Sequence, residues 1–455
     1  MPKVTVYITA FNCDRYVDQA IQSVLKQAYQ DWELIIINDA STDFTWDVLQ
    51  AYRSTPGITL INNKKNIGLI ASAKKAIRLA KGKYIMRLDG DDWLDEHALL
   101  ILTSVLDKNH DIGLVFPDYF TTNEQGAILQ HVRQKKIGSE AKLLDLPAHG
   151  ACTMIRKRCY TSIGGYSRGI KCQDGYDLWI RFVHKYNPYN INLPLFYYRQ
   201  HGTNLTRDSK KILATRKLIK ARFYQRTFKK RAPKILAIIP ARSTSTVYPR
   251  LPLKAIGGKP LLQYAVSAVL KTKAVQRAVF VSDDTELLQH AKPLGIETLL
   301  LPHELTTEQS GIEPVIHHTL TEYKKQHKYA PDIVVVLYLT SPLISEAHIN
   351  EAIHTLRIFG ADSVLSVREN KSLIYRHGVH GLEPLFEKRG LKFERDMLFE
   401  ETGSLTATKA SFVKKKTMLG KKISHILLTE DEAVDINTPF QFWLAEQVIL
   451  QQNRT

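Results

Sequence analysis

Apolar and polar residues follow two different rhythms along the first half of the chain. Short runs rich in Val, Ile and Leu predict strands, and between them apolar residues recur at the three- and four-residue spacing of an amphipathic helix. Alternating strands and helices are typical of a doubly wound, mostly parallel sheet. The expected strands are 4–10, 34–38, 58–61, 84–88 and 113–116, and the expected helices are 16–26, 46–53, 69–80 and 96–106.

The same alternation restarts after Ala232 and Pro233. A chain of 455 residues also exceeds what one hydrophobic core usually organises. The sequence therefore predicts two tandem α/β domains, 1–206 and 234–455, joined by a linker, 207–233. In the second domain the expected strands are 235–239, 278–281, 333–339 and 363–367, and the expected helices are 261–270, 286–294, 314–326 and 346–359; residues 368–434 show no clear pattern.

Charge changes this picture mainly at the linker. The chain carries a formal net charge of +18, and much of the excess falls between Arg207 and Lys234, where Lys and Arg interleave with apolar residues. This pattern predicts a basic helix that either packs its apolar stripe on a neighbouring domain or adsorbs to anionic lipid. No helix-turn-helix, zinc-finger or aromatic RNA-binding pattern accompanies the charge, so we expect no nucleic-acid partner.

The cysteines and the apolar segments bear on location. The four cysteines have no paired spacing, which favours reduced thiols in a cytoplasmic protein over disulfides or a zinc site. The first residues alternate too regularly for a signal peptide, and no stretch reaches membrane-spanning length. We expect a cytoplasmic protein, with peripheral contact at the inner face of the membrane through the linker as an open alternative.

Polar turns follow three of the expected strands, at 9–12, 39–43 and 89–92. Ligands of such sheets bind beyond the carboxyl ends of the strands, so the three turns should converge on one crevice. Asp89, Asp91 and Asp92 crowd one of these turns, and a hard cation such as Mg²⁺ or Mn²⁺ would relieve their repulsion. The alternative is a solvated acidic loop or a helix cap.

Several motifs in the first half resemble, in order and spacing, the family 2 glycosyltransferases of the GT-A type. The resemblance covers about 205 residues and implies a nucleotide-binding domain that uses a nucleotide-sugar donor. The motifs are Thr9-Ala10-Phe11-Asn12, Asn38-Asp39-Ala40-Ser41-Thr42-Asp43, Leu88-Asp89-Gly90-Asp91-Asp92, Gly164-Gly165-Tyr166, Gln173-Asp174-Gly175-Tyr176-Asp177 and Tyr198-Arg199-Gln200-His201.

The resemblance implies roles for individual residues. Asp39 would accept a hydrogen bond from the nucleotide base, and Asp91, helped by Asp89, would hold a metal ion on the diphosphate. Asp89 would also contribute to donor binding. His201 would reach the diphosphate or the metal ion, or else serve a structural role. Three residues would form the floor of the nucleoside site: Thr9, Phe11 and Asn12.

Asp174 is the candidate catalytic base, which would take the proton of the acceptor hydroxyl group. Its alternative role is the N-cap of the helix that follows, and both roles are compatible. Beside Trp179 and Tyr166 its carboxylate would be partly desolvated, which would raise its pKa. Single displacement with a base opposite the leaving group implies inversion of the anomeric configuration.

The second half, from about 234 to 450, resembles cytidylyltransferases that activate acylneuraminate or KDO, and this implies a second nucleotide-binding domain. The motifs are Ile239-Pro240-Ala241-Arg242, Gly257-Gly258-Lys259-Pro260, Leu339-Thr340-Ser341-Pro342 and Val434-Asp435-Ile436-Asn437. The resemblance implies that the residues facing CTP and its metal ion are Arg242, Ser245, Arg250, Lys254, Lys259 and Asp435.

This second half departs from the family pattern at charged positions. Thr246 and Leu251 stand where the family has lysines, and Asn437 stands where it has the second carboxylate of its metal site. Each lost charge-assisted hydrogen bond removes roughly 1.5–3 kcal/mol of binding. We therefore expect weak or no nucleotidyltransferase activity. The alternatives are a bifunctional enzyme that also makes a CMP-sugar acid from CTP, and a non-catalytic module for dimerisation or ligand sensing.

Taken together, the motifs predict an inverting glycosyltransferase that depends on Mg²⁺ or Mn²⁺. The expected donor is a UDP-sugar, and the expected acceptor is a hydroxyl group of a glycan or a lipid-linked sugar in surface-glycan synthesis. A homodimer is a further expectation from the second resemblance.

Overall fold

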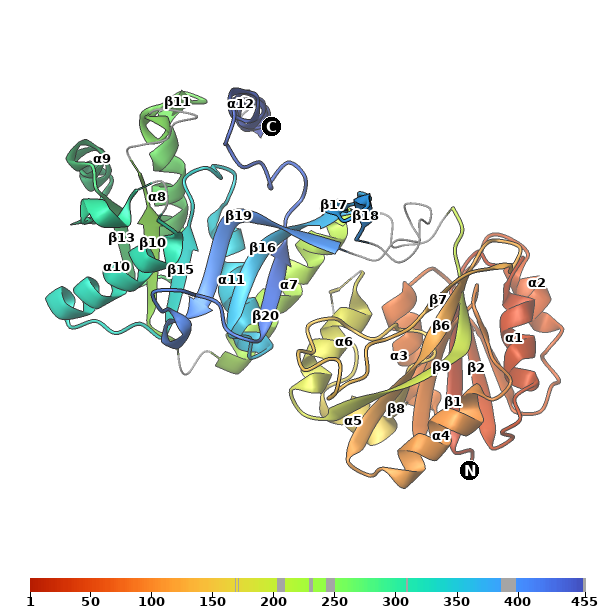
Figure 1. Ribbon diagram of the computed structural model, residues 1–455. Coiled ribbons are helices and arrows are strands. Elements are labelled where there is room, and N and C mark those ends of the chain that lie inside the picture. Colours follow the sequence, from red (N-terminus) through yellow and green to blue (C-terminus); the bar gives the residue numbers. More distant parts are fainter. Residues whose placement is uncertain are drawn as a thin grey trace. The chain divides into compact units, whose positions relative to one another are not determined.

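The computed structural model divides the chain into two compact units, Met1–Arg216 and Lys217–Thr455 (Figure 1). The division falls inside the interval predicted as a linker. Each unit is an α/β domain built on its own mixed sheet. The residues that the structure describes are 1–167, 169–170, 172–202, 209–228, 232–242, 250–307, 310–385 and 398–452.

The first unit contains one sheet with the strand order β3-β2-β1-β4-β8-β6-β9-β5, and β7 pairs with β6. The four strands from β3 to β4 are parallel, as the apolar runs predict, whereas β8 runs antiparallel between β4 and β6. The strands are β1 (Val4–Ala10), β2 (Trp32–Asn38), β3 (Ile58–Asn62), β4 (Tyr84–Asp89), β5 (Trp93–Leu94), β6 (Ile112–Thr122), β7 (Ile128–Val132), β8 (Met154–Arg156) and β9 (Asn187–Arg199).

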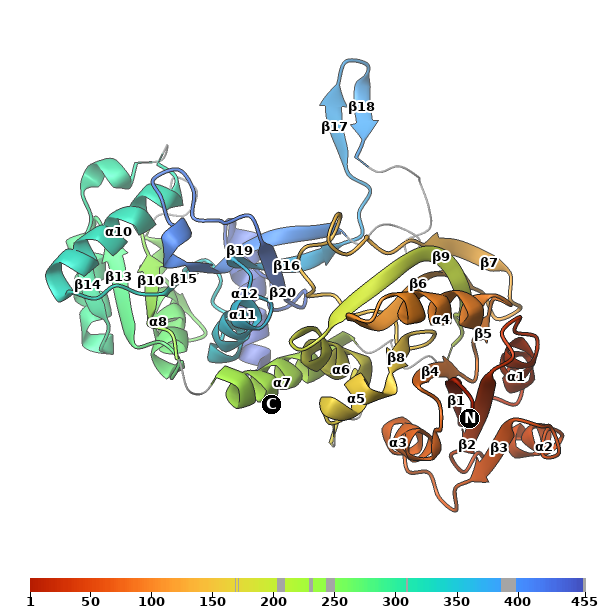
Figure 2. The ribbon, with the colours of Figure 1, turned by 90° about the horizontal axis from the view of Figure 1, so that it is seen from below.

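Helices cover both faces of this sheet. One face packs on α1 (Val17–Leu25), α2 (Thr45–Gln50) and α4 (Ala98–Lys108). The other packs on α3 (Leu69–Leu79), α5 (Lys157–Ser162) and α6 (Asp174–Val183). Because helices cover β1, β2 and β4 on both faces (Figure 2), a buried core cluster on each face holds the polar ends of these strands in place. The core therefore sets the position of the three polar turns.

The second unit has the strand order β14-β13-β10-β15-β19-β16-β20. Its first four strands are parallel, and β19 runs antiparallel between β15 and β16. The strands are β10 (Ile235–Pro240), β11 (Ala255–Ile256), β12 (Lys259–Pro260), β13 (Arg277–Ser282), β14 (Glu297–Leu300), β15 (Ile333–Leu337), β16 (Ser363–Asn370), β17 (Tyr375–Gly378), β18 (Gly381–Pro384), β19 (Leu398–Lys409) and β20 (Ile423–Leu427).

Helices also pack on both faces of the second sheet, with α10 on one face and α8 and α11 on the other (Figure 2). Strands β17 and β18 form a separate hairpin. This hairpin, β19 and β20 all lie in the stretch 368–434, in which the sequence shows no clear pattern. The helices are α8 (Leu261–Lys271), α9 (Thr285–Ala291), α10 (Ile312–His327), α11 (Glu346–Ile358) and α12 (Pro439–Gln452).

One helix, α7 (Ser209–Phe228), lies in the region predicted as a basic linker. Within the second unit its lysines are engaged: Lys220 Nζ lies 2.5 Å from Glu351 Oε1 and 3.0 Å from Thr355 Oγ1. Lys217 Nζ lies 3.6 Å from Glu432 Oε1. This part of α7 is therefore packed against its own unit through buried ion pairs. No helix among the described residues is long and apolar enough to cross a membrane.

Candidate functional site

The polar ends of β1, β2 and β4 meet at one edge of the first sheet, as parallel pairing requires. Thr9 is in register with Ile37 on one side and with Asp89 on the other. Asp39 follows directly after β2, and its backbone N–H donates to Ala10 O over 2.8 Å. The structure thus brings three of the residues singled out from the sequence to a single edge. The Oγ1 atom of Thr9 is buried there and has no partner among the described residues.

Asp39 is buried and organises the neighbouring loop. Its Oδ1 accepts hydrogen bonds from Asn63 Nδ2 and from the backbone N–H of Ile67, both over 2.9 Å. Its Oδ2 accepts one from Gly68 N over 2.7 Å, where Gly68 adopts a φ of 87° that favours glycine. A carboxylate oxygen can accept more than one hydrogen bond, so this arrangement leaves Oδ2 capacity for a ligand donor.

Asn12 and Phe11 lie in the turn after β1. Asn12 adopts a φ of 50°, and its Oδ1 accepts a hydrogen bond from Thr42 N over 2.9 Å. Its own backbone N–H donates to Ser41 Oγ over 3.0 Å. The turns after β1 and β2 are therefore tied together. The ring of Phe11 is exposed beside them, where a planar ligand could stack.

At this edge of the sheet the carboxylate of Asp91 pairs with the imidazole of His201. His201 Nε2 lies 2.8 Å from Asp91 Oδ2, and the His201 ring stacks on Tyr16 with centroids 5.4 Å apart. Burial raises the pKa of Asp91, and the charge of Asp89 adds to this effect, whereas His201 opposes it. A carboxylate that is costly to ionise in this way favours a neighbouring cation.

The loop that carries Asp91 is packed tightly. Asp92 is buried, and its Oδ1 accepts a hydrogen bond from Arg199 N over 2.9 Å, which joins the loop to the end of β9. Burial raises the pKa of Asp92 well above its usual value. At Gly90 a Cβ atom would lie 2.9 Å from Cys13 Sγ, so the loop closely approaches the segment between β1 and α1. Asp92 thus supports the loop instead of facing the crevice.

Arg87, which sequence reasoning missed, connects Asp89 to Asp174. Its Nε donates to Asp89 Oδ1 over 2.5 Å and its Nη2 donates to Asp89 Oδ2 over 3.1 Å. Its Nη1 donates to Asp174 Oδ2 over 3.1 Å. Burial alone would lower the pKa of Arg87, but the two carboxylates raise it well above its usual value. The signal in the sequence was a lone arginine inside an apolar strand.

Asp174 is the first residue of α6, and Gln173 is the N-cap. Gln173 adopts a φ of 61°, and no side chain caps the helix. The alternative role of Asp174 as the N-cap is therefore wrong, because its carboxylate is turned toward Arg87. The side chains of Asp174 and Arg87 are each 13% exposed, so their ion pair is mostly shielded from water.

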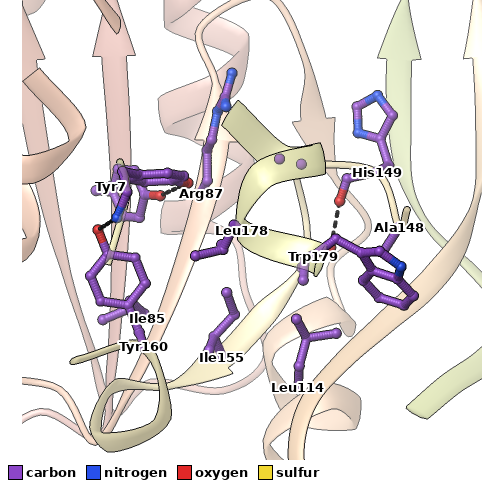
Figure 3. A pocket seen from close by; sticks show the side chains of 14 residues that line it. Tyr7, Ile85, Arg87, Leu114, Ala148, His149, Ile155, Tyr160, Leu178 and Trp179 are labelled. Atoms are coloured by element: carbon purple, nitrogen blue, oxygen red, sulfur yellow. Dashed lines mark hydrogen bonds between the residues drawn. The ribbon is translucent and has the colours of Figure 1, made fainter. Parts of the chain in front are cut away.

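A small cavity lies beside this ion pair, between β1, β4, β6 and β8 on one side and α6 on the other. Figure 3 shows Arg87 and His149 near its upper rim and Leu114 and Ile155 below. The hydroxyl groups of Tyr7 and Tyr166 are hydrogen bonded to each other over 2.9 Å. Burial lowers the pKa of His149 to about 4, so this second residue missed from the sequence is a neutral imidazole at neutral pH.

The residues at the Asp91 turn fit a divalent cation that has few protein ligands. Among the residues that the structure describes, no group of three or more His, Cys, Asp or Glu side chains could hold a metal ion. Asp91 and His201 nevertheless offer an oxygen and a nitrogen at one point. Mg²⁺ is commonly bound through one or two carboxylates, with phosphate oxygens of the substrate and water as the other ligands. Both oxygens of Asp89 instead accept hydrogen bonds from Arg87.

The corresponding turn of the second unit is organised differently. Ile436 N donates to Thr340 O over 2.8 Å, which places Asp435 near the carboxyl end of β15. Asn437 Nδ2 donates to Asp435 Oδ2 over 2.5 Å. The Oδ1 atom of Asp435 is buried and has no hydrogen-bond partner within the described parts of the chain. An amide thus occupies the position from which a second carboxylate would face a cation.

The cationic residues of the second unit do not converge on Asp435 in this structure. Arg242 donates to the carbonyl oxygens of Thr307 and Ser310, and Arg250 Nη2 lies 2.6 Å from Glu286 Oε2. Lys254 and Lys259 are exposed beside the β11–β12 turn. Ser245 lies outside the described residues.

Comparisons with known proteins agree with this two-part organisation. A family model described as glycosyl transferase family 2 matches residues 5–164, and a model described as cytidylyltransferase matches residues 236–386. The chain belongs to glycosyl transferase family 2 through its first unit, and it carries a cytidylyltransferase-like second unit. Both resemblances inferred from the sequence are thereby confirmed.

Individual relatives match the first unit. The putative glycosyltransferase EpsE of Bacillus subtilis (strain 168) is 32% identical over 217 residues, which are 46% of this chain and 77% of that protein. The chondroitin synthase of Escherichia coli is 28% identical over 206 residues, which are 45% of this chain and 30% of the synthase. The match therefore spans less than a third of the synthase.

Solved structures share a lower sequence identity with this chain. TarS of S. aureus in complex with UDP-GlcNAc has a TM-score of 0.43 and 14% identity, over 49% of this chain and 66% of that chain. The CMP:2-keto-3-deoxy-manno-octonic acid synthetase complexed with CTP has a TM-score of 0.38 and 17% identity, over 48% of this chain and 99% of that chain.

Proposed function

We propose that the first unit is an inverting glycosyltransferase that moves a sugar from a UDP-sugar to a hydroxyl group of a glycan or lipid-linked acceptor in surface-glycan synthesis. The observation that carries this proposal is the arrangement at one sheet edge: Asp91, on the loop after Asp89, pairs with His201, which follows β9, and Arg87 joins Asp89 to Asp174. Membership of the family and relatives in polysaccharide synthesis support it.

The donor would bind along the turns after β1, β2 and β4. Asp39 is rigidly held by Asn63 and Gly68 and would orient the base, with Thr9, Asn12 and Phe11 around the nucleoside. Asp91 and His201 would hold Mg²⁺ or Mn²⁺. When bound, such a cation supplies electrostatic stabilisation of the negative charge that develops on a leaving diphosphate.

Asp174 would accept the proton of the acceptor hydroxyl group as that group attacks the anomeric carbon. The ion pair with Arg87 engages Oδ2 of Asp174 and fixes the direction of the carboxylate that would take the proton. In this scheme the anomeric C–O bond to the diphosphate breaks as the new glycosidic bond forms, and the proton ends on Asp174. A single displacement of this kind inverts the anomeric configuration.

The test is to incubate the full chain with Mn²⁺ or Mg²⁺ and a panel of UDP-sugars and acceptors. Nucleotide release is followed together with the anomeric configuration of the product by NMR. We expect transfer from at least one UDP-sugar with inverted configuration. Transfer with retention would contradict the single displacement, and release of CMP or GDP instead of UDP from matched donors would contradict the choice of donor.

For the second unit we propose weak or absent nucleotidyltransferase activity. The observation that favours this is the hydrogen bond between Asn437 and Asp435, which uses one of the carboxylate oxygens that would face a cation. The alternative is a bifunctional enzyme that also makes a CMP-sugar acid. Incubation with CTP and a panel of sugar acids decides between them, because pyrophosphate release that is lost in Asp435→Ala would establish the bifunctional enzyme.

The β17–β18 hairpin supports a homodimer of the second unit. Tyr375, Val379, Leu382 and Leu385 are exposed apolar residues on or next to this hairpin, and Val379 is 90% exposed. Burying such residues against a second copy would remove apolar surface from water. We expect a dimer in analytical ultracentrifugation that dissociates in the double variant V379D/L382D. Leu300→Asp, an exposed leucine outside the hairpin, is the matched control.

Peripheral membrane contact through α7 would have to use its exposed cations, since Lys217 and Lys220 face Glu351 and Glu432. Arg222 and Arg226 are exposed on this helix. Co-sedimentation with vesicles of increasing anionic lipid content tests this contact. Binding should weaken in R222Q/R226Q and not in K415Q/K416Q, a control pair of exposed lysines in the same unit. The predicted cytoplasmic location stays a prediction.

A further inference from the structure

Arg87 lies where the donor side and the acceptor side of the first unit meet. We propose that Arg87 is a positioning residue that holds Asp89 and Asp174 in a fixed relative orientation, so that the base is aligned with the donor. This inference rests on the proposed glycosyltransferase function. Neither Asp89 nor Asp174 is reached by another arginine within the described residues, so the connection depends on this one side chain.

The geometry of the contacts is specific to a guanidinium group. Arg87 uses Nε and Nη2 for the two oxygens of Asp89, and Nη1 for Asp174. These donors lie in one rigid plane, so fixing the plane on one carboxylate also fixes the direction offered to the other. A lysine in the same place has one ammonium group and could not make this paired contact with both partners.

The surroundings hold the arginine itself in place. Its backbone carbonyl accepts a hydrogen bond from Cys152 N over 2.9 Å, and its residue is in register with Tyr7 of β1. Gly150 lies beside the guanidinium group, and a Cβ atom there would be in ordinary van der Waals contact with Nη1, at 3.5 Å. The side chain is only 13% exposed. The position is thus set by β4, by its register with β1 and by the buried Cys152 that precedes β8.

Loss of Arg87 should affect chemistry more than binding. In R87M the two carboxylates would face each other without their shared cation, and Asp174 would lose its fixed direction. Misplacement of a reacting group by about 1 Å can lower a rate about 100-fold. We therefore expect kcat to fall about 100-fold while KM for the donor stays within about threefold. R87K keeps the charge and should recover about tenfold of this loss.

Arg156 is a matched control in the same sheet. It is a fully buried arginine on β8 whose Nε donates to Ile112 O over 2.6 Å and whose Nη2 donates to Asn109 O over 2.8 Å. In the described part of the chain it makes no ion pair with a carboxylate. R156M should therefore lower the unfolding temperature and leave kcat per folded molecule unchanged.

The experiment measures kcat and donor KM for wild type, R87M, R87K and R156M with the UDP-sugar found active, and measures UDP affinity with Mn²⁺ by calorimetry. A fall in kcat for R87M with partial recovery in R87K and unchanged UDP affinity supports the proposal. If R87M matches R156M, or if donor KM and kcat change equally, the proposal is wrong. Should R87M not fold, R87Q and R87K provide the same comparison. Absence of transfer by the wild type would instead overturn the proposed function.

Discussion

Each unit carries a carboxylate turn near the carboxyl end of a parallel strand, β4 in the first unit and β15 in the second, and the turns differ in what surrounds them. In the first unit Asp89 is held by Arg87, and Asp91 faces His201, so two carboxylates of the turn have positively charged or titratable side chains as partners. In the second unit Asp435 is bonded by Asn437 two residues later. Two similar α/β sheets thus surround their carboxylate turns with different side chains.

The arginine side chains of the two units also differ in their partners. Arg87 reaches inward from a central strand and contacts two carboxylates of the site. Arg242 and Arg250 of the second unit are bonded to backbone carbonyls and to Glu286. Arg87 thus pairs with two carboxylates of the candidate site, whereas Arg242 and Arg250 are bonded to other groups.

The largest effect should come from the candidate base. Asp174→Asn keeps the size of the side chain and removes its ability to take a proton, so we expect sugar transfer to fall about 10²–10⁴-fold. UDP affinity should stay unchanged in calorimetry because the base acts on the acceptor. An unchanged transfer rate would show that Asp174 is not the base. The proposed chemical difference between the two units would then lose its main support.

The second effect concerns the cation site. Asp91→Ala should lower transfer about 10³-fold, because electrostatic stabilisation by a metal ion is worth several kcal/mol. The matched variant in the other unit, Asp435→Ala, should leave transfer unchanged. Both are measured as initial rates over a Mn²⁺ titration. Equal losses in the two variants would show that the second unit takes part in the transfer.

A third prediction tests how α7 stabilises the second unit. Lys220→Met removes the nearer partner of the buried Glu351 and leaves only its 3.9 Å contact with Lys217, so the free energy of unfolding of this unit should fall by about 3 kcal/mol, the lower end of the range for breaking a buried ion pair. Lys217→Met removes a longer contact and should have a smaller effect. Denaturant unfolding of the full chain, followed by fluorescence and hydrogen exchange, measures both. A neutral Lys220→Met would mean that α7 contributes little to this unit.

A fourth prediction compares the buried histidines. Burial lowers the pKa of His354 in the second unit to about 4, and Lys220 adds to this effect. The unfolded chain, with an ordinary histidine pKa near 6.5, binds a proton that the folded unit does not bind between these values. Stability should therefore fall as the pH drops from about 6.5 to 4, by at most about 1.4 kcal/mol per pH unit.

Removal of this histidine sharpens the fourth prediction. His354→Phe should flatten the pH dependence of unfolding for the second unit and leave the first unit with its own dependence from His149, whose pKa is also about 4. Thermal unfolding between pH 4.5 and 7 provides the slopes. An unchanged slope in the variant would show that His354 ionises freely in the folded state.

The smallest effect is expected from restoring a carboxylate. Asn437→Asp removes the amide that bonds Asp435 and places two carboxylates together, so Mg²⁺-dependent CTP affinity should rise about tenfold, the scale of one charge-assisted contact. Asn437→Ala is the control, because it frees Asp435 without adding charge. If both variants bind CTP like the wild type, the lost carboxylate does not explain the weakness proposed for this site.

The sequence predicted much of the fold because apolar periodicity reports burial directly. β1 spans the expected 4–10, and α3 and α8 end within one residue of their expected bounds. The antiparallel strands β8 and β19 were not predicted, because β8 has three residues and β19 lies in a stretch without clear periodicity. Pairing direction depends on tertiary contacts that periodicity does not encode.

The candidate site was predicted less completely. Asp39, Asp89 and Asp174 were singled out from motifs, and the structure brings all three to one region. Arg87 was missed because a charged residue within a strand looks like a surface position until its partners are known. His149 was missed because it lies in a stretch without a recognised pattern, and its neutral state depends on burial that only the folded chain provides.

The contact of α7 with Glu351 also bears on where the chain can be cut. A truncated protein that began at residue 234, the predicted start of the second domain, would lack Lys217 and Lys220 and would leave Glu351 buried and unpaired. A truncated protein that began before Lys217 would keep these partners. The sequence boundary and the boundary needed for an independently stable fragment therefore lie at least 17 residues apart, between Lys217 and Lys234.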